Sequence, residues 1–256
     1  MKSGSCYSTI VAVLLAFAVP AFSQQSTPAL VNISRVQVRS DRIPEFLELG
    51  RQRAEAVKKS APADWFVIVY RTVIGNTNEF LAISPMNKFA DRDGQPPYYS
   101  TTTPEQRATW NARGSQYVER SLNTIERPLS DLTVTVSGAK FPSTFVRYSR
   151  IRVRPGMEDQ FINTLKTDII PVIKKINGSM RVRQTALGGN INDFTLTMPF
   201  EKWAELDDTT IFQNAIGGEQ ALRKLHEKMS QIEAGTERYV LRYMPDLSYI
   251  PATPGR

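Results

Sequence analysis

GNTNEFLAISPMNKFAD occupies residues 75–91, and GNINDFTLTMPFEKWAE occupies residues 189–205. The two stretches share Gly, Asn, Phe, Pro, Lys and Ala in register, with Glu/Asp and Phe/Trp exchanged at equivalent positions. Their starting residues are 189 − 75 = 114 apart. SRVQVRS (34–40) and SRIRVRP (149–155) are related at nearly the same offset, 149 − 34 = 115. The chain therefore contains two related halves, which we place at residues 29–137 and 144–250. A repeat of this length is a whole domain rather than a solenoid unit.

The first half predicts a strand, a helix, two strands, a second helix and a last strand. Residues 33–39 alternate apolar and polar, and residues 65–73 and 79–84 are rich in β-branched and aromatic side chains. Pro44 can open the first helix, and Thr103-Pro104-Glu105-Gln106 has the form of a capping box for the second. That second helix is expected to carry Trp110, Val118, Leu122 and Ile125, and residues 131–136 to form the closing strand.

The second half predicts the same order. Its strands are expected at 148–154, near 180–187, at 193–198 and at 237–243. The first helix, between Ile162 and Ile176, contains Pro171, which should kink it, and Gly178 is expected to end it. A short helix at 200–207 precedes a longer one whose apolar side runs from Leu222 to Ile232.

The order β-α-β-β-α-β is that of a ferredoxin-like sheet with helices on one face. The predicted fold class is therefore α+β, with two ferredoxin-like halves in tandem. Such a sheet leaves its other face uncovered, and the second half is the obvious partner for it. The chain thus resembles the dimeric α+β-barrel superfamily, which includes antibiotic-biosynthesis-type monooxygenases, NIPSNAP-like proteins and tandem haem enzymes. The resemblance implies a fold and a range of functions, because no catalytic motif accompanies it.

Haem and zinc sites are not indicated. The resemblance implies that a haem enzyme of this superfamily takes its proximal histidine from the first helix of the second half, and that helix has none. The single histidine, His226, lies at the edge of an apolar stripe, where a structural role is the simpler interpretation and a ligand or base the alternative. One histidine and one cysteine cannot form the usual zinc site. We therefore expect no metal and no cofactor.

The first residues predict export. MKSGSCYS is followed by the apolar run TIVAVLLAFAV and by small residues around Ser23, which is the pattern of a secretory signal peptide at residues 1–23. Cleavage after Ser23 would remove Cys6, the only cysteine, and leave 256 − 23 = 233 residues. A cysteine-free exported chain favours the bacterial periplasm or the extracellular space. The formal net charge of +7 favours anionic partners, but no basic run points to nucleic acid. The sequence predicts no membrane contact after cleavage and allows a homo-oligomer.

Arginines alternate with apolar residues on several predicted strands. If Val36, Val38, Ile151, Val153 and Val182 face the helices, the opposite face receives arginines from both halves, since alternate residues of a strand share a face. Arg242 is a further candidate for that face. Unpaired guanidinium groups cannot be buried dry. Two interpretations remain open: the arginines pair with acids or face solvent, or they bind an organic anion through bidentate hydrogen bonds. The candidate ligand-binding residues are Arg150, Arg152, Arg154, Arg181, Arg183, Tyr70, Trp65 and His226.

Three functions follow. The first is an exported protein that binds a small organic anion. The second is an enzyme, a cofactor-independent monooxygenase or isomerase that acts on a phenolic or quinone-like substrate. The third is a structural protein whose halves pack without a cavity. An insertion peculiar to the first half, DRDGQPPYYSTTT (91–103), is expected to form a lid, an oligomer contact or a plain surface loop.

Overall fold

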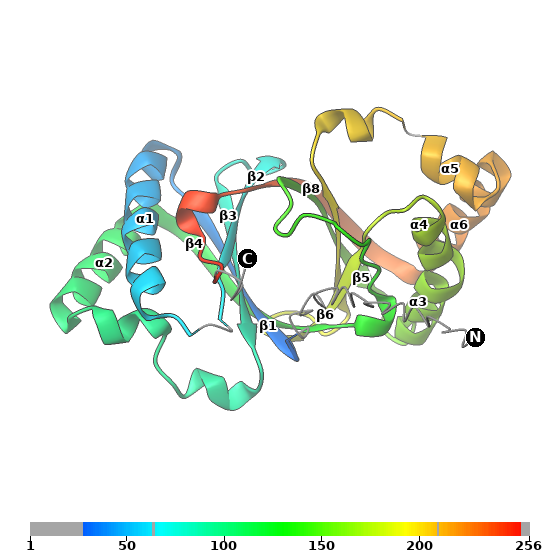
Figure 1. The fold of residues 1–256 in the computed structure, drawn as a ribbon. Helices are drawn as coiled ribbons and strands as arrows, with labels where there is room; N and C mark the ends of the chain where they lie inside the picture. Colours follow the sequence, from blue (N-terminus) through cyan, green and yellow to red (C-terminus); the bar gives the residue numbers. More distant parts are fainter. Residues whose placement is uncertain (1–27, 63–64, 209, 252–256) are drawn as a thin grey trace, which may run out of the picture.

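Eight antiparallel strands close into a barrel (Figure 1). The computed structural model describes residues 28–62, 65–208 and 210–251, so the predicted signal peptide and Cys6 lie outside the described residues. The strand order around the ring is β1-β3-β2-β8-β5-β7-β6-β4. The strands are β1 (Leu30–Val38), β2 (Ile68–Ile74), β3 (Glu79–Met86), β4 (Val118–Pro128), β5 (Phe145–Val153), β6 (Arg181–Leu187), β7 (Asp193–Phe200) and β8 (Glu233–Tyr243).

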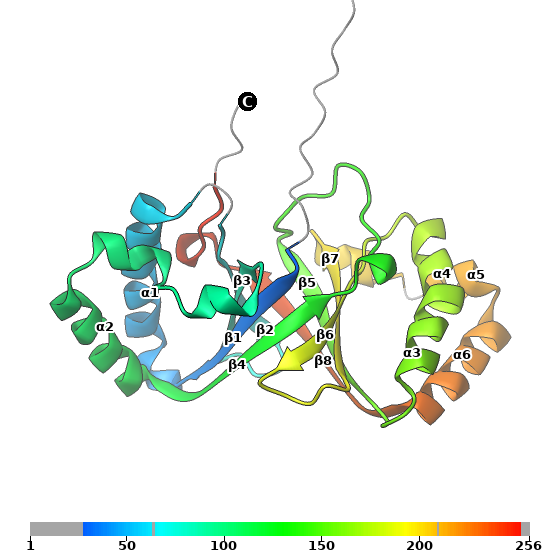
Figure 2. The same ribbon diagram turned by 90° about the horizontal axis from the view of Figure 1, so that it is seen from below.

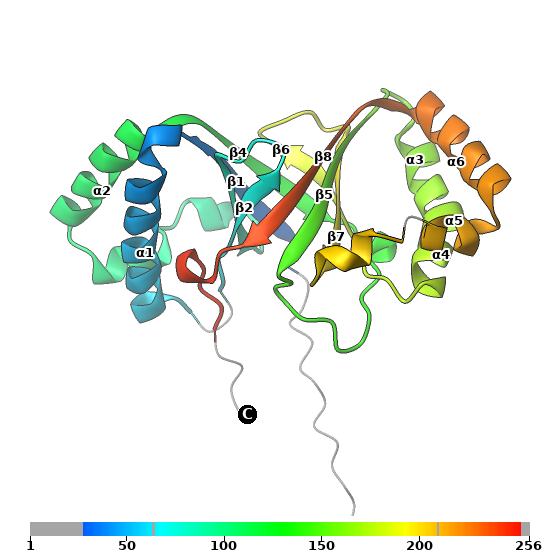
Figure 3. The same ribbon diagram turned by 90° about the horizontal axis from the view of Figure 1, so that it is seen from above.

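The first four strands form one side of the ring, in the order β4-β1-β3-β2, and the last four form the other, in the order β8-β5-β7-β6. Two seams join the sides. At one seam β2 pairs with β8, next to β5 (Figure 3), and at the other β4 pairs with β6 (Figure 2). Because the ring is closed, neither side keeps an unpaired strand edge.

Helices cover the ring on two opposite sides (Figure 1). The first side carries α1 (Ile43–Ser60) and α2 (Pro104–Tyr117), and the second carries α3 (Glu158–Thr164), α4 (Ile170–Lys175), α5 (Thr210–Ile216) and α6 (Glu219–Ile232). Val36 and Val38 pack with α1, and Ile151, Val153 and Val182 pack in the core under the second group. The predicted orientation of these strand residues is confirmed. Within the described residues, no helix is long and apolar enough to span a bilayer.

The two similar stretches of sequence adopt the same local structure. In each, the asparagine after the glycine turns the chain between two strands: the side chain of Asn76 accepts from the N–H of Asn78, and that of Asn190 from the N–H of Asn192. Further on, one acidic side chain accepts two successive backbone N–H groups at the start of a short 3₁₀ helix, which is Phe89–Arg92 or Trp203–Leu206. The shared residues therefore encode a turn and a helix cap.

One predicted helix is partly wrong. Thr103 and Gln106 form the expected capping box, but α2 ends at Tyr117, and Val118, Leu122 and Ile125 belong to strand β4. The predicted strand 131–136 is instead a 3₁₀ turn at Ser130–Leu132 followed by a single bridge between Val134 and Met180. The apolar spacing in 118–125 fits either structure locally. Pairing of β4 with both β1 and β6 decides for the strand, because it satisfies the backbone on both edges.

The first helix of the second half is interrupted as Pro171 predicts. A π-helical turn, Leu165–Ile169, separates α3 from α4, and Pro171 lies in the first turn of α4, where it lacks an N–H to donate. The residue with left-handed backbone after α4 is Asn177, with φ 52°, rather than Gly178. The N–H of Gly178 instead donates to the Ile173 carbonyl (2.8 Å).

The insertion at 91–103 packs on the outside of the first half. It contains a 3₁₀ turn, Pro97–Thr101, and the Thr101 hydroxyl donates to the Ala56 carbonyl of α1 (3.1 Å). The segment therefore extends the helical layer, and it does not cover a barrel end through this contact.

A substitution at Gly188 tests the close approach of the chain to β4 at the seam between the two halves of the ring. Its φ is +82°, and a Cβ at this position would lie 2.2 Å from the Asn123 carbonyl oxygen of β4. We expect Gly188→Ala to lower the free energy of unfolding in urea by about 2–4 kcal/mol, since backbone strain and a backbone clash add. Gly235→Ala is the control, because no atom lies within 4 Å of its Cβ position. Equal stability of the two variants would contradict the role of this close approach.

Candidate functional site

The inner face of the barrel carries the predicted arginines. Arg35 of β1 and Arg150 and Arg152 of β5 alternate with residues that face the helices, so their side chains point into the barrel. Arg181 and Arg183 of β6, on either side of Val182, also point inward. Between the two ends of the interior lies an apolar cluster that includes Ile33, Val146, Tyr148 and Leu241, and Tyr70 packs on the side of it away from Arg150. An eight-stranded barrel is just wide enough for side chains to fill, so this cluster divides the interior into two ends.

A buried ion pair lies between β4 and β6. The Arg183 Nε donates to Glu126 Oε2 at 2.8 Å, and the two side chains are 9% and 6% exposed. The other carboxylate oxygen of Glu126 accepts from the Thr195 hydroxyl (3.3 Å). Arg183 Nη2 is buried without a hydrogen-bond partner among the described residues. Both oxygens of Glu126 are thus occupied, and one guanidinium nitrogen remains unbonded.

Arg35 continues this polar network toward one end of the barrel. It donates to the Tyr148 hydroxyl (3.0 Å), and its guanidinium lies 5.5 and 5.9 Å from the ring centroids of Tyr148 and Tyr239. The Tyr148 hydroxyl lies 3.4 Å from that of Thr195. Because Thr195 already donates to Glu126, Tyr148 supplies the proton of this contact. A hydrogen-bonded chain therefore runs from Arg35 to the buried ion pair.

Arg150 and Arg152 share one acid, Asp193 of β7. The closest contacts are 2.6 Å from Arg150 Nη2 and 2.8 Å from Arg152 Nε, and the Asp193 side chain is 2% exposed. Burial opposes the charged carboxylate, but hydrogen bonds from Arg152 and Arg150 outweigh it and hold the pKa of Asp193 below its usual value. Arg150 and Arg152 therefore pair with an acid, which is the first of the two interpretations that the sequence left open.

A cavity of about 300 Å³ opens at the end of the barrel where Arg35 and Arg150 lie. Burial raises the pKa of Glu79, and the neighbouring Glu237 adds to this while Arg35, 3.7 Å away, opposes it. Burial and a hydrogen bond to Glu237 raise the pKa of Tyr239 to about 12. We call this cavity the mouth; it is lined by Arg35, Gln37, Asn76, Glu79, Arg120, Leu122, Arg150, Glu237 and Tyr239.

Three other predicted site residues lie at the opposite end. Tyr70 is buried beside Tyr243, with ring centroids 5.9 Å apart, and Arg181 lies 5.1 Å from the ring centroid of Phe141. Trp65 stacks on Tyr249. The predicted residues therefore do not share one pocket, because the apolar cluster around Tyr148 lies between Arg150 and this end.

Two predicted residues lie outside the barrel interior. Arg154 follows β5, is exposed, and bonds through its backbone N–H to the Ile232 carbonyl (2.8 Å). His226 is exposed on α6, on the outer helical layer. Arg242 lies on the outer face of β8, opposite Arg71 of β2, so the suggestion that it joins the inner arginines is wrong. Within the described residues, no group of three potential metal-ligating side chains occurs.

Sequence reasoning missed the acids of the site. Glu79 begins β3, Glu237 lies within β8 at the start of the predicted strand 237–243, and Glu126 follows the predicted second helix, so none was expected opposite an arginine. Arg120 was missed for the same reason. The usable signal was alternation: Arg120, Leu122, Thr124 and Glu126 are spaced by two, as the inner face of a strand requires.

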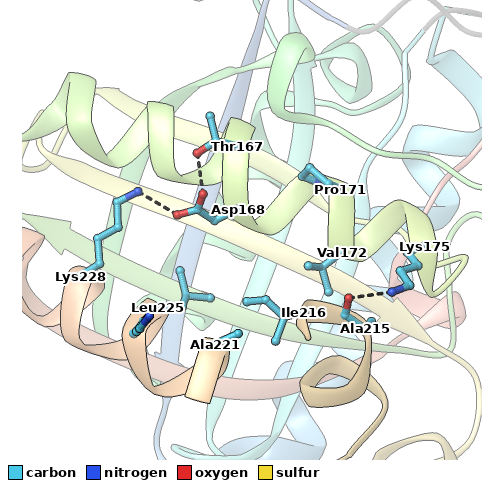
Figure 4. Close-up of a pocket in the computed structure, with 11 residues that line it drawn as sticks. Thr167, Asp168, Pro171, Val172, Lys175, Ala215, Ile216, Ala221, Leu225 and Lys228 are labelled. Atoms are coloured by element: carbon cyan, nitrogen blue, oxygen red, sulfur yellow. Dashed lines mark hydrogen bonds and ion pairs between the residues drawn. The ribbon is translucent and has the colours of Figure 1, made fainter. Parts of the chain in front are cut away.

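A larger crevice, of about 450 Å³, lies between α4 and the α5–α6 pair (Figure 4). Its apolar floor includes Val172 and Leu225. At its rim Lys228 bonds to Asp168 (2.8 Å), and Lys175 bonds to the Ala215 carbonyl (3.1 Å). These charged groups hold helices to one another. We therefore place the candidate site at the mouth, where charged groups from five strands converge on one space.

Comparison with known proteins shows the fold. No family model matches the chain, and no curated protein matches it by sequence. Among solved structures, an anthrone oxidase-like protein superposes with a TM-score of 0.58 at 11% identity, covering 86% of this chain and 93% of its own. A "putative monooxygenase" from Lactobacillus acidophilus NCFM gives 0.55 at 11%, covering 87% and 95%. A mutant chlorite dismutase from Candidatus Nitrospira defluvii gives 0.52 at 8%, covering 87% and 94%. These neighbours belong to the dimeric α+β-barrel superfamily, whose fold the chain shares.

The buried pair of Glu126 and Arg183 makes a stability prediction. Glu126→Gln leaves the Arg183 charge uncompensated, so we expect the free energy of unfolding in urea to fall by about 3–5 kcal/mol. The double variant Glu126→Leu/Arg183→Met removes both charges and should recover most of the loss. Glu119→Gln, on the exposed face of the same strand, is the control and should change stability little. A double variant no more stable than Glu126→Gln would contradict the assignment.

Proposed function

We propose that the protein binds a small organic anion at the mouth of the barrel. The observation that carries this proposal is the convergence of three guanidinium groups on a cavity of about 300 Å³. Ligand sites are concave, lie at barrel ends and place a few polar groups around an apolar surface. The mouth meets these criteria: Leu122 and Tyr239 supply the apolar surface, and Gln37 and Asn76 supply amides.

The charge of the mouth favours an anion. Arg35, Arg120 and Arg150, with the adjacent Arg152, stand against Glu79, Glu237 and Asp193, which leaves 4 − 3 = one positive charge when the three acids are ionised. Arg120 forms no ion pair within 4 Å among the described residues, whereas Arg35 and Arg150 each contact an acid. A carboxylate or phenolate could accept a bidentate hydrogen bond from the Arg120 guanidinium.

The aromatic surroundings favour a ligand with a flat body. The guanidinium group of Arg35 lies over the ring of Tyr239, so a flat cationic group and an aromatic ring lie next to each other at the mouth. A planar ligand could stack there while its anionic group reaches Arg120. This arrangement supports an aromatic or conjugated acid over a short aliphatic one.

An enzymatic role is the second candidate, and Glu79 favours it. Its raised pKa suits a base that takes a proton from a phenolic substrate, and Arg35 beside it could hold the resulting phenolate. In a monooxygenase without a bound cofactor, one atom of dioxygen would enter the substrate as a carbonyl oxygen, and the other would leave as water with two hydrogens of the oxidised CH2 group, so the substrate itself supplies the electrons. The names of the structural neighbours, which include an anthrone oxidase-like protein, make this alternative plausible, but a shared fold does not fix a reaction.

We also infer that the two halves are copies of one ferredoxin-like unit and that the protein is exported. The matching local structures at Asn76 and Asn190 support the first inference. The apolar run before Ser23 supports the second. Export would place the mouth in contact with small molecules of the periplasm or the medium.

Binding of 4-hydroxybenzoate tests the proposed function. We expect isothermal titration calorimetry to give saturable binding to the protein and a Kd about 10-fold or more higher for Arg120→Gln, since a charge-assisted hydrogen bond is lost. Arg113→Gln, which changes an exposed arginine of α2, is the matched control. Equal affinity of the Arg120→Gln and Arg113→Gln variants would place the ligand elsewhere.

Oxygen uptake tests the second candidate. If the protein is a monooxygenase, it consumes dioxygen with an anthrone substrate, and Glu79→Gln lowers the rate about 100-fold or more because the base is lost. The rate of the unchanged protein should fall as the pH is lowered through a value above the usual 4.5 of glutamate, since only the carboxylate accepts a proton. If oxygen uptake does not exceed the rate without protein, the enzymatic candidate is wrong and only the binding function remains.

A further inference from the structure

The end of the barrel opposite the mouth holds a positive charge without a counter-charge. Arg181 forms no ion pair within 4 Å among the described residues and lies against the Phe141 ring. Burial lowers the pKa of Arg181, Tyr70 opposes this shift, and the like charge of Arg183 adds to it. Arg181 and Arg183 are two residues apart on β6, so both side chains lie on its inner face.

Among the described residues, the acid that forms an ion pair at this end is Glu126, and it pairs with Arg183 alone. Glu126 accepts from Arg183 Nε with one oxygen and from Thr195 with the other. It neutralises one of the two arginines. The Arg183 Nη2 atom remains buried without a partner, and the Arg183 side chain is 9% exposed. A buried donor without a partner costs about 1–3 kcal/mol, and more when it carries charge.

Tyr70 adds a third donor. Burial raises the pKa of its phenol to about 12, although Arg181 and Arg183 act against this, so the hydroxyl is neutral at physiological pH. The Ser143 hydroxyl near it donates to the Phe145 carbonyl (2.8 Å), so in a contact between Ser143 and Tyr70 the phenol is the donor. Two guanidinium groups and a neutral phenol therefore lie on the inner face toward this end, and Glu126 forms an ion pair with only one of the two guanidinium groups.

We propose that Arg181, Arg183 Nη2 and the Tyr70 hydroxyl form a second anion site, distinct from the mouth, that binds a monocarboxylate. One uncompensated positive charge matches one negative charge, whereas a phosphate dianion would leave the region net negative. Two guanidinium groups suit the planar, bidentate geometry of a carboxylate. Phe141, which is 46% exposed, lies over Arg181 and marks the side from which a ligand could enter.

The second anion site and the proposed function of the mouth can be tested separately. Tyr148, Val146 and Leu241 pack between the two ends, so a molecule in one does not occupy the other. Each end also has its own arginine without an ion pair among the described residues, Arg120 at the mouth and Arg181 here. Variants of these two arginines therefore separate the two hypotheses.

The test is thermal unfolding in sodium acetate that replaces sodium chloride at constant ionic strength. We expect the Tm of the unchanged protein to rise with acetate concentration, because a ligand that binds only the folded state stabilises it. The rise should persist in Arg120→Gln and in Arg113→Gln and be lost in Arg181→Gln. If Arg181→Gln does not fold, Tyr70→Phe retains the packing of the ring and should raise the apparent Kd for acetate about 3-fold or more.

Two results would overturn the proposal. One is an equal rise of Tm in Arg181→Gln, or in Tyr70→Phe where that variant is used, or no rise in any variant. The other is a crystal structure at saturating acetate in which only a water molecule bonds to Arg183 Nη2. A rise that disappears in Arg120→Gln but persists in Arg181→Gln would assign acetate to the mouth and would refute a second site.

Discussion

The ion pair between Glu126 and Arg183 is the constraint around which the interior is arranged. It lies at the seam between β4 and β6, one of the two places where the halves of the ring meet. Both side chains are buried, so each must satisfy its hydrogen bonds within the barrel. Each oxygen of Glu126 accepts one hydrogen bond, from Arg183 and from Thr195. Through Thr195 and Tyr148 its bonds extend to Arg35, and the polar network thereby reaches the mouth.

The two ends of the barrel differ in their balance of charge. At the mouth, arginines stand beside Glu79 and Glu237, and Arg150 and Arg152 share Asp193. At the other end, Arg183 pairs with Glu126, and Arg181 forms no ion pair within 4 Å among the described residues. The mouth therefore has two glutamates beside its arginines, whereas at the other end the one glutamate that contacts an arginine is held in the buried pair with Arg183. This difference assigns the candidate enzymatic role to the mouth only.

The outer helices support the barrel, and the candidate site lies in its interior. At 8–11% identity, the structural neighbours superpose over 86–87% of this chain. A fold that persists at such low identity can house many functions, so the shared fold does not show what this chain does. His226 is exposed on α6, in the outer helical layer, and so lies outside the candidate site.

The sequence by itself determined the repeated hairpin, the capping box at Thr103, the interruption at Pro171 and the inward direction of Arg150, Arg152, Arg181 and Arg183, although not that of Arg154 and Arg242. Each of these depends on contacts within a few residues or on the two-residue period of a strand. The tertiary structure decided that residues 118–128 form a strand, since that segment is ambiguous until β1 and β6 pair with it. It also decided which acid meets which arginine, because Arg183 and Glu126 are 57 residues apart in the chain. Closure of the ring, which no local pattern encodes, brings them together.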